Sequence, residues 1–433
     1  MSGGRDVPSF DFDVAVVGAG PAGIAAACTS AATGAQTLLL ESDATLGGNV
    51  SQALVHTICG LYFPSADHRA EFAHHGIARS FAETLIAQDA AGSVQWAGTS
   101  GYLPILPQRF AQLAAARCAA SGARVETSTR LIGLMLSLDD AQPCVLETQR
   151  ADGSRGAATA AFVIDTTGDA HAATLACATT ESASADDLQH ASFIVGIDNV
   201  DTDALGAMEC ARISTAVARA IRDGALPAGA ASMVVRRSAK SGSVFVTVNL
   251  EKPAGHVFDP LETRCSAVLH ANAVAAGEAI FEFLRRERAA FRDAKRGQQP
   301  TRVGIRETRR IVGLERLETD DVFAGRRRDD EVAVSTWPIE LWESAQRLTF
   351  QPVAGPSSIP LRCLVADHPS RRLAMAGRCA SASHEALGAI RVIATSMSMG
   401  EAAGAACGLA AQSRRALDQL NAAEVRDAVS RVA

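Results

Sequence analysis

The segment from Asp13 to Glu41 constrains the fold more than any other part of the chain. An apolar run at 14–17 leads into a glycine-rich turn, and an alanine-rich run then ends at Gly34. A second strand is predicted over 36–40, and it delivers Glu41 eighteen residues after Gly23. Continuous apolar strands joined by a helix are typical of a parallel sheet that is buried on both faces. The chain is therefore predicted to have an α/β fold.

The turn in this segment has the G-x-G-x-x-G pattern of a dinucleotide site. Its first glycine makes a tight turn, its second lets backbone approach a pyrophosphate, and its third lets the helix pack against the strand. The start of the helix attracts the pyrophosphate, and an acid at the end of the next strand accepts ribose hydroxyls. The alternative is a glycine-rich loop without a ligand. We favour an adenine dinucleotide on a Rossmann-like fold, contacted by Gly18, Gly20, Pro21, Ala22, Gly23, Glu41 and Ser42.

Length and charge narrow the class of protein further. A chain of 433 residues is expected to form two domains. A formal net charge of −6 argues against a nucleic-acid partner or an anionic membrane, so a small-molecule substrate is expected. The first thirteen residues contain Arg5, Asp6, Asp11 and Asp13 and no apolar run, which predicts no signal peptide and a cytoplasmic protein.

Ten cysteines are spread along the chain without a C-x-x-C pair. The two nearest in sequence are Cys363 and Cys379. This spacing argues against a zinc or iron–sulfur site and against a dithiol pair of neighbouring residues. We therefore expect reduced core thiols and no metal.

Four further motifs carry a resemblance to a known family. They are Leu46-Gly47-Gly48-Asn49, then FVIDTTGD at 162–169, GIRETRRIVGLERLETDDV at 304–322, and the block from Ala376 to Met399. With the N-terminal motif, they resemble FAD-dependent oxidoreductases of the glutathione reductase-like (GR2-type) superfamily, in the group with the signature AGRCxSAxHEAxGxIRV. The resemblance spans most of the chain and is weak between about 181 and 302.

The resemblance implies a three-layer, Rossmann-like FAD-binding domain with an inserted mixed α+β substrate domain. The FAD-binding domain would comprise 1–55, 104–181 and 355–433, and the substrate domain 56–103 and 182–354. Strand signals at 191–196 and 243–249 and helical signals at 203–222 and 259–290 fall in the second domain. A basic amphipathic helix is expected over 285–296. No second G-x-G-x-x-G occurs, so the electron acceptor would be oxygen or another carrier.

The resemblance also implies positions for the cofactor contacts. Gly47, Gly48 and Asn49 would run beside the pyrophosphate and ribitol, and Arg130 and Leu131 would lie near the adenine. Gly377 and Arg378 would approach the ribitol, although many relatives have Asp in place of Arg378. A long helix starting near 390 would aim its N–H groups at the flavin N1/O2 edge. The remaining expected contacts are Thr167, Gly168, Gly388, Ala389 and Ile390.

The reacting residues are predicted with alternatives left open. His384 is the first candidate for proton transfer, and the alternative is that His384 and Glu385 only shape a turn. His56 follows the glycine pair and is a second candidate, with a satisfied core histidine as the alternative. Cys59 is interpreted as an inert thiol rather than a redox group or flavin anchor.

The arginines of the 303–318 segment form a further candidate group. Strand alternation would place Arg306 and Arg310 on one face and Arg309 on the other, so that one of them clamps a substrate carboxylate. The alternative is a salt-bridge ladder with the acidic residues of the same segment.

The leading hypothesis is an enzyme that uses FAD to dehydrogenate or oxidise a small organic substrate by hydride transfer to flavin N5, possibly in specialised metabolism. A flavin monooxygenase or a C=C reductase is the alternative within enzymes. From other classes, a flavin-dependent tRNA-modifying protein would need a basic surface, and a non-catalytic flavin-binding module would not need the signature near the ring. The substrate, the direction of electron flow, covalent attachment and the oligomeric state are left open by the sequence.

Overall fold

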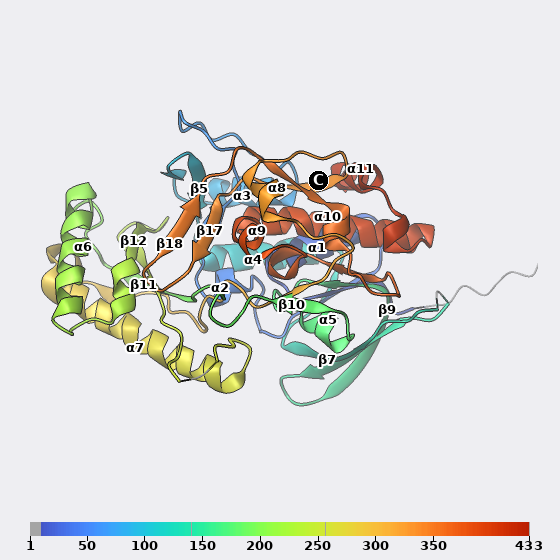
Figure 1. The fold of residues 1–433 in the computed structure, drawn as a ribbon, viewed down its shortest axis with the longest axis horizontal. Coiled ribbons are helices and arrows are strands. Elements are labelled where there is room, and N and C mark those ends of the chain that lie inside the picture. The colour runs from blue at the N-terminus through green and yellow to red at the C-terminus, as the bar shows by residue number, and fades with distance from the viewer. Residues whose placement is uncertain (1–9, 140, 256, 433) are drawn as a thin grey trace, which may run out of the picture.

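A parallel sheet forms the centre of the molecule (Figure 1). The computed structural model describes residues 10–139, 141–255 and 257–432. Neighbouring strands run in the order β6, β2, β1, β9 and β20. Their bounds are β1 Phe12–Val17, β2 Thr37–Leu40, β6 Arg124–Glu126, β9 Arg155–Asp165 and β20 Leu373–Met375. The predicted α/β fold is confirmed. Arg5 and Asp6, which the sequence analysis named, lie outside the described residues.

Three helices cover one face of this sheet. They are α1 Pro21–Ala32, α4 Pro107–Ser121 and α10 Ile393–Ser413. Their apolar side chains share one core with Val14, Val16 and Leu39 of the sheet. Alternate strand residues point to this face because successive side chains of a strand point to opposite sides.

An antiparallel meander lies on the other face. It consists of β7 Thr129–Met135 and β8 Cys144–Arg150, which pairs with the first half of β9. The second half of β9 pairs with β1, so one strand belongs to both sheets. Ala15, Val17 and Leu38 pack here with the meander and with α5 His171–Leu175. Helices, sheet and meander make the predicted three layers.

A second antiparallel sheet has its own core, at the left of Figure 1. Its strand order is β12 Val234–Arg237, β13 Ser243–Asn249, β11 Ser192–Asp198 and β14 Lys295–Arg296. Helices α6 Ala207–Arg222 and α7 Thr263–Glu287 contribute Ile213 and Ile280 to this core. The strands and helices expected in this region are therefore present. By length and composition α7 is the one described helix that could cross a membrane, but 44% of its most apolar window is buried.

The predicted basic helix over 285–296 is wrong. Helix α7 ends at Glu287 because Arg288 is extended, with φ −126° and ψ 120°. A short 3₁₀ turn at Ala289–Phe291 then buries Phe291, and the chain enters β14. Arg288 instead forms an ion pair with Glu209 of α6.

The remaining elements connect these two parts. They are α2 Asn49–Gln52, β3 Thr57–Cys59, α3 Ile77–Ala87, β4 Gln95–Ala97, β5 Ser100–Pro104, β10 Thr180–Ser182, β15 Arg309–Ile311, α8 Thr319–Phe323, β16 Glu331–Ser335, β17 Ile339–Trp342, β18 Leu348–Gln351, β19 Ser357–Pro360, α9 His384–Ile390 and α11 Ala422–Val432. Ile58, Phe81 and Leu103 pack in the same core as α1. This packing favours counting segment 58–103 with the parallel sheet, and the domain boundaries stay a prediction.

Candidate functional site

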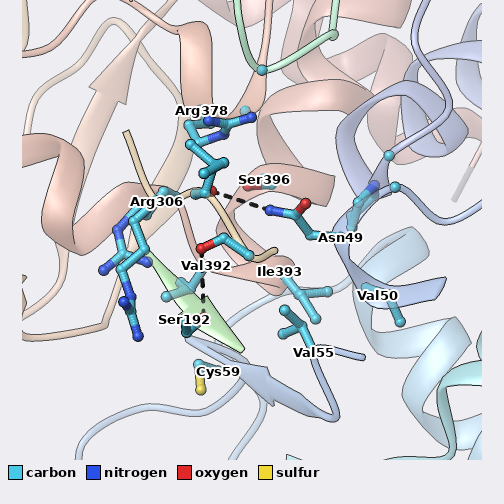
Figure 2. A pocket seen from close by; sticks show the side chains of 18 of the residues that line it. Asn49, Val50, Val55, Cys59, Ser192, Arg306, Arg378, Val392, Ile393 and Ser396 are labelled. Carbon is cyan, nitrogen blue, oxygen red and sulfur yellow. Dashed lines mark hydrogen bonds between the residues drawn. The ribbon is translucent and has the colours of Figure 1, made fainter. Parts of the chain in front are cut away.

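A cavity of about 1110 Å³ lies where the parallel sheet meets the second sheet. Its wall contains the ends of β1, β2 and β9, the starts of α1 and α10, and residues of β11, β12 and β13. The carboxyl ends of parallel strands are the usual place for ligands in such sheets. Figure 2 shows Arg306 and Asn49 on opposite sides of this cavity, with Val392, Ile393 and Ser396 between them.

The glycine turn can hold only glycine at two positions. Gly18 has φ +97°, and a Cβ there would lie 2.9 Å from the Thr166 carbonyl oxygen. A Cβ on Gly23 would lie 1.8 Å from the Gly18 carbonyl oxygen. Gly20 caps α1 without a side chain, and Pro21 takes the first helical position. The first-turn N–H groups of α1 are therefore available to an anion.

Glu41, which directly follows β2, is hydrogen-bonded to the backbone of the glycine turn. It is 6% exposed, and its carboxylate accepts hydrogen bonds from the backbone N–H of Ala19 at 2.7 Å and of Asp43 at 2.9 Å. The Ser42 hydroxyl donates to it at 3.1 Å. Burial raises the pKa of Glu41 despite these bonds. Glu41 and Ser42 both line the cavity, so the expected ribose acceptor lies in its wall.

The second glycine pair lies directly against the first turn. The N–H of Gly47 donates to the Ala19 carbonyl at 2.8 Å, and Gly48 has φ +51° with a Cβ position 3.0 Å from Cα of Gly20. Asn49 lines the cavity and donates through Nδ2 to the Ile305 carbonyl at 3.2 Å (Figure 2). Gly48 and Asn49 line the cavity, whereas Gly47 does not and contacts the glycine turn through its bond to Ala19.

Further expected cofactor contacts, on β7, after β9 and in the C-terminal block, also reach the cavity. Arg130 and Leu131 of β7 line it, as do Thr167 and Gly168 after β9. Gly377 has φ +83°, and its Cβ position lies 3.1 Å from the Cβ of Ala22. The motif residues of the two halves of the chain thus meet at one site.

Arg378 is paired with a carboxylate. Its guanidinium donates to Asp169 at 2.9 Å, and both side chains line the cavity. Thr308 donates to the same carboxylate at 2.9 Å. An acid is therefore present beside residue 378 even though that residue is an arginine, because Asp169 follows the end of β9.

The helix expected to start near Ala389–Ile390 starts later. Gly388, Ala389 and Ile390 lie buried in α9 and are not part of the cavity wall in the described chain. Arg391 ends α9, Val392 is extended with φ −73° and ψ 158°, and α10 starts at Ile393. Val392, Ile393 and Ser396 line the cavity. The uncapped first turn of α10 therefore faces the cavity, and the long helix begins at Ile393 rather than near 390.

His384 and Glu385 lie at the start of α9, outside the cavity wall. His384 Nδ1 lies 2.9 Å from the carboxylate of Glu307, which is fully buried and raises the pKa of the imidazole. Glu385 accepts a hydrogen bond from the Thr319 hydroxyl at 3.0 Å. These contacts match the alternative in which both residues shape the turn.

His56 lies in the cavity wall. Its Nδ1 is 3.0 Å from the Leu54 carbonyl, so Nδ1 carries the proton and Nε2 has a free lone pair. Nε2 has no hydrogen-bond partner among the described residues. The ring stacks on Phe245 at 4.4 Å, and burial together with Arg236 lowers its pKa to about 3. His56 is therefore a neutral acceptor at physiological pH.

Cys59 also lines the cavity, on β3. Burial and the nearby Glu340 raise the pKa of its thiol to about 12. A thiol that stays protonated is a weak nucleophile. This fits the predicted inert role.

The arginine segment differs from the predicted alternation. Arg306 and Arg309 both line the cavity, whereas Arg310 is 4% exposed and forms an ion pair with Glu307. Only Arg309–Ile311 of the segment is a strand, so alternation does not extend to Arg306. The salt-bridge alternative holds for Arg310, and Arg306 remains available to a ligand.

A cluster of charged and aromatic side chains in the cavity wall was not predicted from the sequence. Glu340 accepts hydrogen bonds from the indole N–H groups of Trp337 and Trp342, each at 3.0 Å. Arg391 donates to the Glu340 carbonyl at 3.2 Å. Arg236 of β12 also lines the cavity. Two features of the sequence could have indicated this cluster. Two of the three tryptophans lie within six residues of one another, and an arginine stands inside the C-terminal signature.

Comparison with known proteins agrees with this geometry. The profile of the family described as FAD dependent oxidoreductase matches residues 13–429. No curated protein matches the chain.

Several solved structures are similar in fold. A geranylgeranyl bacteriochlorophyll reductase-like protein from Thermoplasma acidophilum has 14% identity and a TM-score of 0.46 over 97% of this chain and 91% of its own. A flavoprotein/dehydrogenase from Cytophaga hutchinsonii has 12% identity and a TM-score of 0.46 over 93% of this chain and 79% of its own. The OxyS anhydrotetracycline hydroxylase from Streptomyces rimosus has 13% identity and a TM-score of 0.43, over 91% of this chain and 62% of its own.

Proposed function

Because this chain belongs to the family of FAD-dependent oxidoreductases, we propose that it dehydrogenates or oxidises a small organic substrate in the cavity described above. The observation that carries the proposal is the convergence of two uncapped helix starts, those of α1 and α10, on one cavity. One suits a pyrophosphate and the other suits negative charge that develops during reduction.

The residues present fit FAD. A Cβ on Gly20 would meet nothing within 4 Å, so the space beside the turn is open to a ligand. In this proposal Gly18, Gly20, Gly48 and Gly377 flank the dinucleotide and Glu41 accepts ribose hydroxyls. FAD supplies a hydride acceptor at the flavin N5 when it is bound.

His56 and Arg306 are the proposed substrate residues. The lone pair at His56 Nε2, which has no partner among the described residues, accepts a hydrogen bond from a substrate hydroxyl or amine in this proposal. Arg306 orients the substrate from the neighbouring wall. His384 acts at a distance in this proposal, by holding Glu307 and the start of α9.

The first test is the presence of the cofactor. The purified protein is expected to be yellow and to release FAD on denaturation, as measured by absorbance and chromatography. A colourless protein that cannot be reconstituted with FAD would contradict the proposal.

The second test separates the reaction types. Protein that has been photoreduced under anaerobic conditions is mixed with oxygen or with candidate acceptors, and oxidised protein is mixed anaerobically with NADH, NADPH or candidate substrates. Flavin bleaching by an organic substrate alone supports dehydrogenation or oxidation. Bleaching by NADPH that requires the organic substrate to proceed quickly would instead identify a monooxygenase, and oxidation of reduced flavin by an alkene would identify a C=C reductase.

A further inference from the structure

One end of the cavity has more positive than negative charge. Arg236, Arg306 and Arg391 all line it, with Glu340 as the nearby carboxylate. Arg236 comes from β12 and Arg391 from the end of α9, and both charges favour the ionised form of the Cys59 thiol, against burial and Glu340, which raise its pKa. Burial and Arg391 lower the pKa of Arg306 to about 9, which leaves its guanidinium charged at neutral pH.

The single carboxylate does not neutralise these guanidinium groups. Both oxygens of Glu340 already accept indole N–H bonds, and Arg391 approaches one of them only to 3.6 Å. Among the described residues Arg306 forms no ion pair: it donates to the His190 carbonyl and lies 5.0 Å from the ring centre of Trp342. Buried cations of this kind are stabilised when an anion binds between them.

The arginines near the dinucleotide turn differ in this respect. Arg302 is paired with Asp43, and Arg378 with Asp169. The pyrophosphate also has the start of α1 as its partner. Arg130 and Arg309 also line the cavity without an ion pair among the described residues, so the end beside Cys59 and His56 is distinguished by three guanidinium groups, those of Arg236, Arg306 and Arg391, around the one carboxylate of Glu340. The substrate of the proposed reaction would bind at this end.

Aromatic side chains line the same end, where the guanidinium of Arg306 lies 5.0 Å from the ring centre of Trp342. Trp337 and Trp342 line it, and Trp337 packs edge-on against Phe350 at 5.8 Å. Aromatics are only 5% of the chain, so two of its three tryptophans in one wall are a local concentration. Indole faces bind planar bodies, and guanidinium groups bind carboxylates in two-pronged geometry.

We propose that the substrate is a planar carboxylic acid, aromatic or conjugated, whose carboxylate lies between Arg306 and Arg391 and whose ring contacts Trp342. This inference rests on the proposed function and adds the chemical class of the substrate. Arg236 of β12 adds to the positive field without a required contact.

The test uses the FAD-loaded full chain and benzoate as the probe. Isothermal titration calorimetry and flavin difference spectra are expected to show benzoate binding at least tenfold tighter than benzamide, its neutral analogue, and than inorganic phosphate. Equal binding of benzoate and benzamide would overturn the charge argument. Binding of phosphate as tight as that of benzoate would overturn the inference that the substrate is a planar carboxylic acid.

Variants locate the site. Arg306→Gln is expected to weaken benzoate at least tenfold and to leave benzamide unchanged, and Arg306→Lys is expected to recover part of the affinity. Arg316→Gln is the matched control, because Arg316 lies outside the cavity wall and pairs with Glu318. Loss of FAD from Arg306→Gln with unchanged benzoate affinity would assign the guanidinium to the cofactor and overturn the proposal.

The two proposals fail in different ways. A protein that binds no FAD contradicts the proposed function. A yellow protein that is reduced by a neutral compound and shows no preference for benzoate contradicts only the substrate class. The preference of the unchanged protein for benzoate over benzamide needs no variant, so it tests the inference even if Arg306→Gln does not fold.

Discussion

At the residue scale, the position of each ring nitrogen decides which histidine suits proton transfer. Both His56 and His384 were reasonable from sequence, because each stands near a glycine-containing motif. The structure gives His384 a buried carboxylate partner outside the cavity and leaves Nε2 of His56 without a partner in the cavity wall. Sequence alone does not contain this distinction, since Glu307 and His384 are far apart in the chain.

We expect His56→Phe to slow reduction of the flavin by substrate at least 100-fold and to leave FAD binding unchanged. The phenyl ring keeps the stack on Phe245 and removes the Nε2 acceptor. Stopped-flow absorbance measures the rate. His74→Phe is the control, since His74 is also buried and bonded to a carbonyl, at 2.8 Å, but does not line the cavity. Equal rates for His56→Phe and the unchanged protein would remove His56 from the mechanism.

The pH profile gives an independent check on the same residue. Because burial and Arg236 lower the pKa of His56 to about 3, it is neutral over the working range. The rate of flavin reduction should show no inflection from His56 between pH 5 and 9. An inflection near 6.5 that disappears in His56→Phe would contradict this prediction.

Glu401 makes a second residue-scale prediction, about stability. It is 4% exposed on α10 and accepts the N–H of Ile77 at 2.6 Å, at the start of α3. Burial raises its pKa from 4.5 to about 7. The unfolded chain therefore releases this proton first, and the free energy of unfolding falls as pH rises from 4.5 through 7, by up to about 3 kcal/mol.

Glu401→Gln removes this titration and keeps an oxygen acceptor. Relative to the unchanged protein, the variant is expected to be more stable at pH 8 than at pH 5. Denaturant unfolding of both proteins at the two pH values measures the difference, in which the other titrating groups cancel. A difference that does not change with pH would refute the prediction.

At the element scale, the pattern of apolar residues and the positions of glycines predicted most helices and strands. They did not predict helix ends that depend on contacts with distant parts of the chain. The glycine turn, β1 and β2 follow from local sequence. The break between α9 and α10 does not, because it depends on Arg391 reaching Gln189 and Glu340 from distant segments. The end of α7 likewise depends on the pairing of Arg288 with Glu209.

Helices α1 and α10 pack through glycines. Cβ atoms on Gly400 and Gly404 would lie 2.1 and 2.3 Å from the carbonyl oxygens of Ala22 and Ala26. Gly404→Ala is therefore expected to destabilise the protein by roughly 2 kcal/mol or more, because the backbones must separate. Thermal and urea unfolding measure the change.

Gly206→Ala is the control for this variant. Its Cβ would meet nothing within 4 Å, and its φ of −80° is open to alanine. We expect a change of at most about 1 kcal/mol, because Gly206 is the N-cap of α6, where glycine is preferred over alanine. Equal effects of the two substitutions would contradict the close-packing argument.

At the scale of the whole molecule, the structure has two hydrophobic cores with a cavity between them, as expected for a cofactor-binding part and a second part inserted into it. The sequence located the cofactor segments at the start, middle and end of the chain, and these segments do line one cavity. The cavity end with Trp337, Glu340 and Trp342 was missed, because it forms only when β17 approaches the second sheet.

The cysteines provide a test of the overall packing. All ten are free thiols: Cys177 and Cys210 are exposed, Cys59 is half-buried and the other seven are buried. Two thiols of the native protein are expected to react rapidly with a thiol reagent at pH 8, and ten after denaturation. Rapid reaction of a third thiol, identified by peptide mass spectrometry as Cys59, would contradict its raised pKa.

The contact of α1 with α10 also affects how the protein is made. Helix α1 packs, backbone against backbone, on α10, which is encoded far later in the sequence. The nascent β1–α1–β2 unit therefore keeps an apolar face exposed until α10 has been synthesised, and during that time aggregation competes with folding. Since Ile393 and Ser396 of α10 also line the cavity, we expect FAD to bind only after α10 has packed on α1.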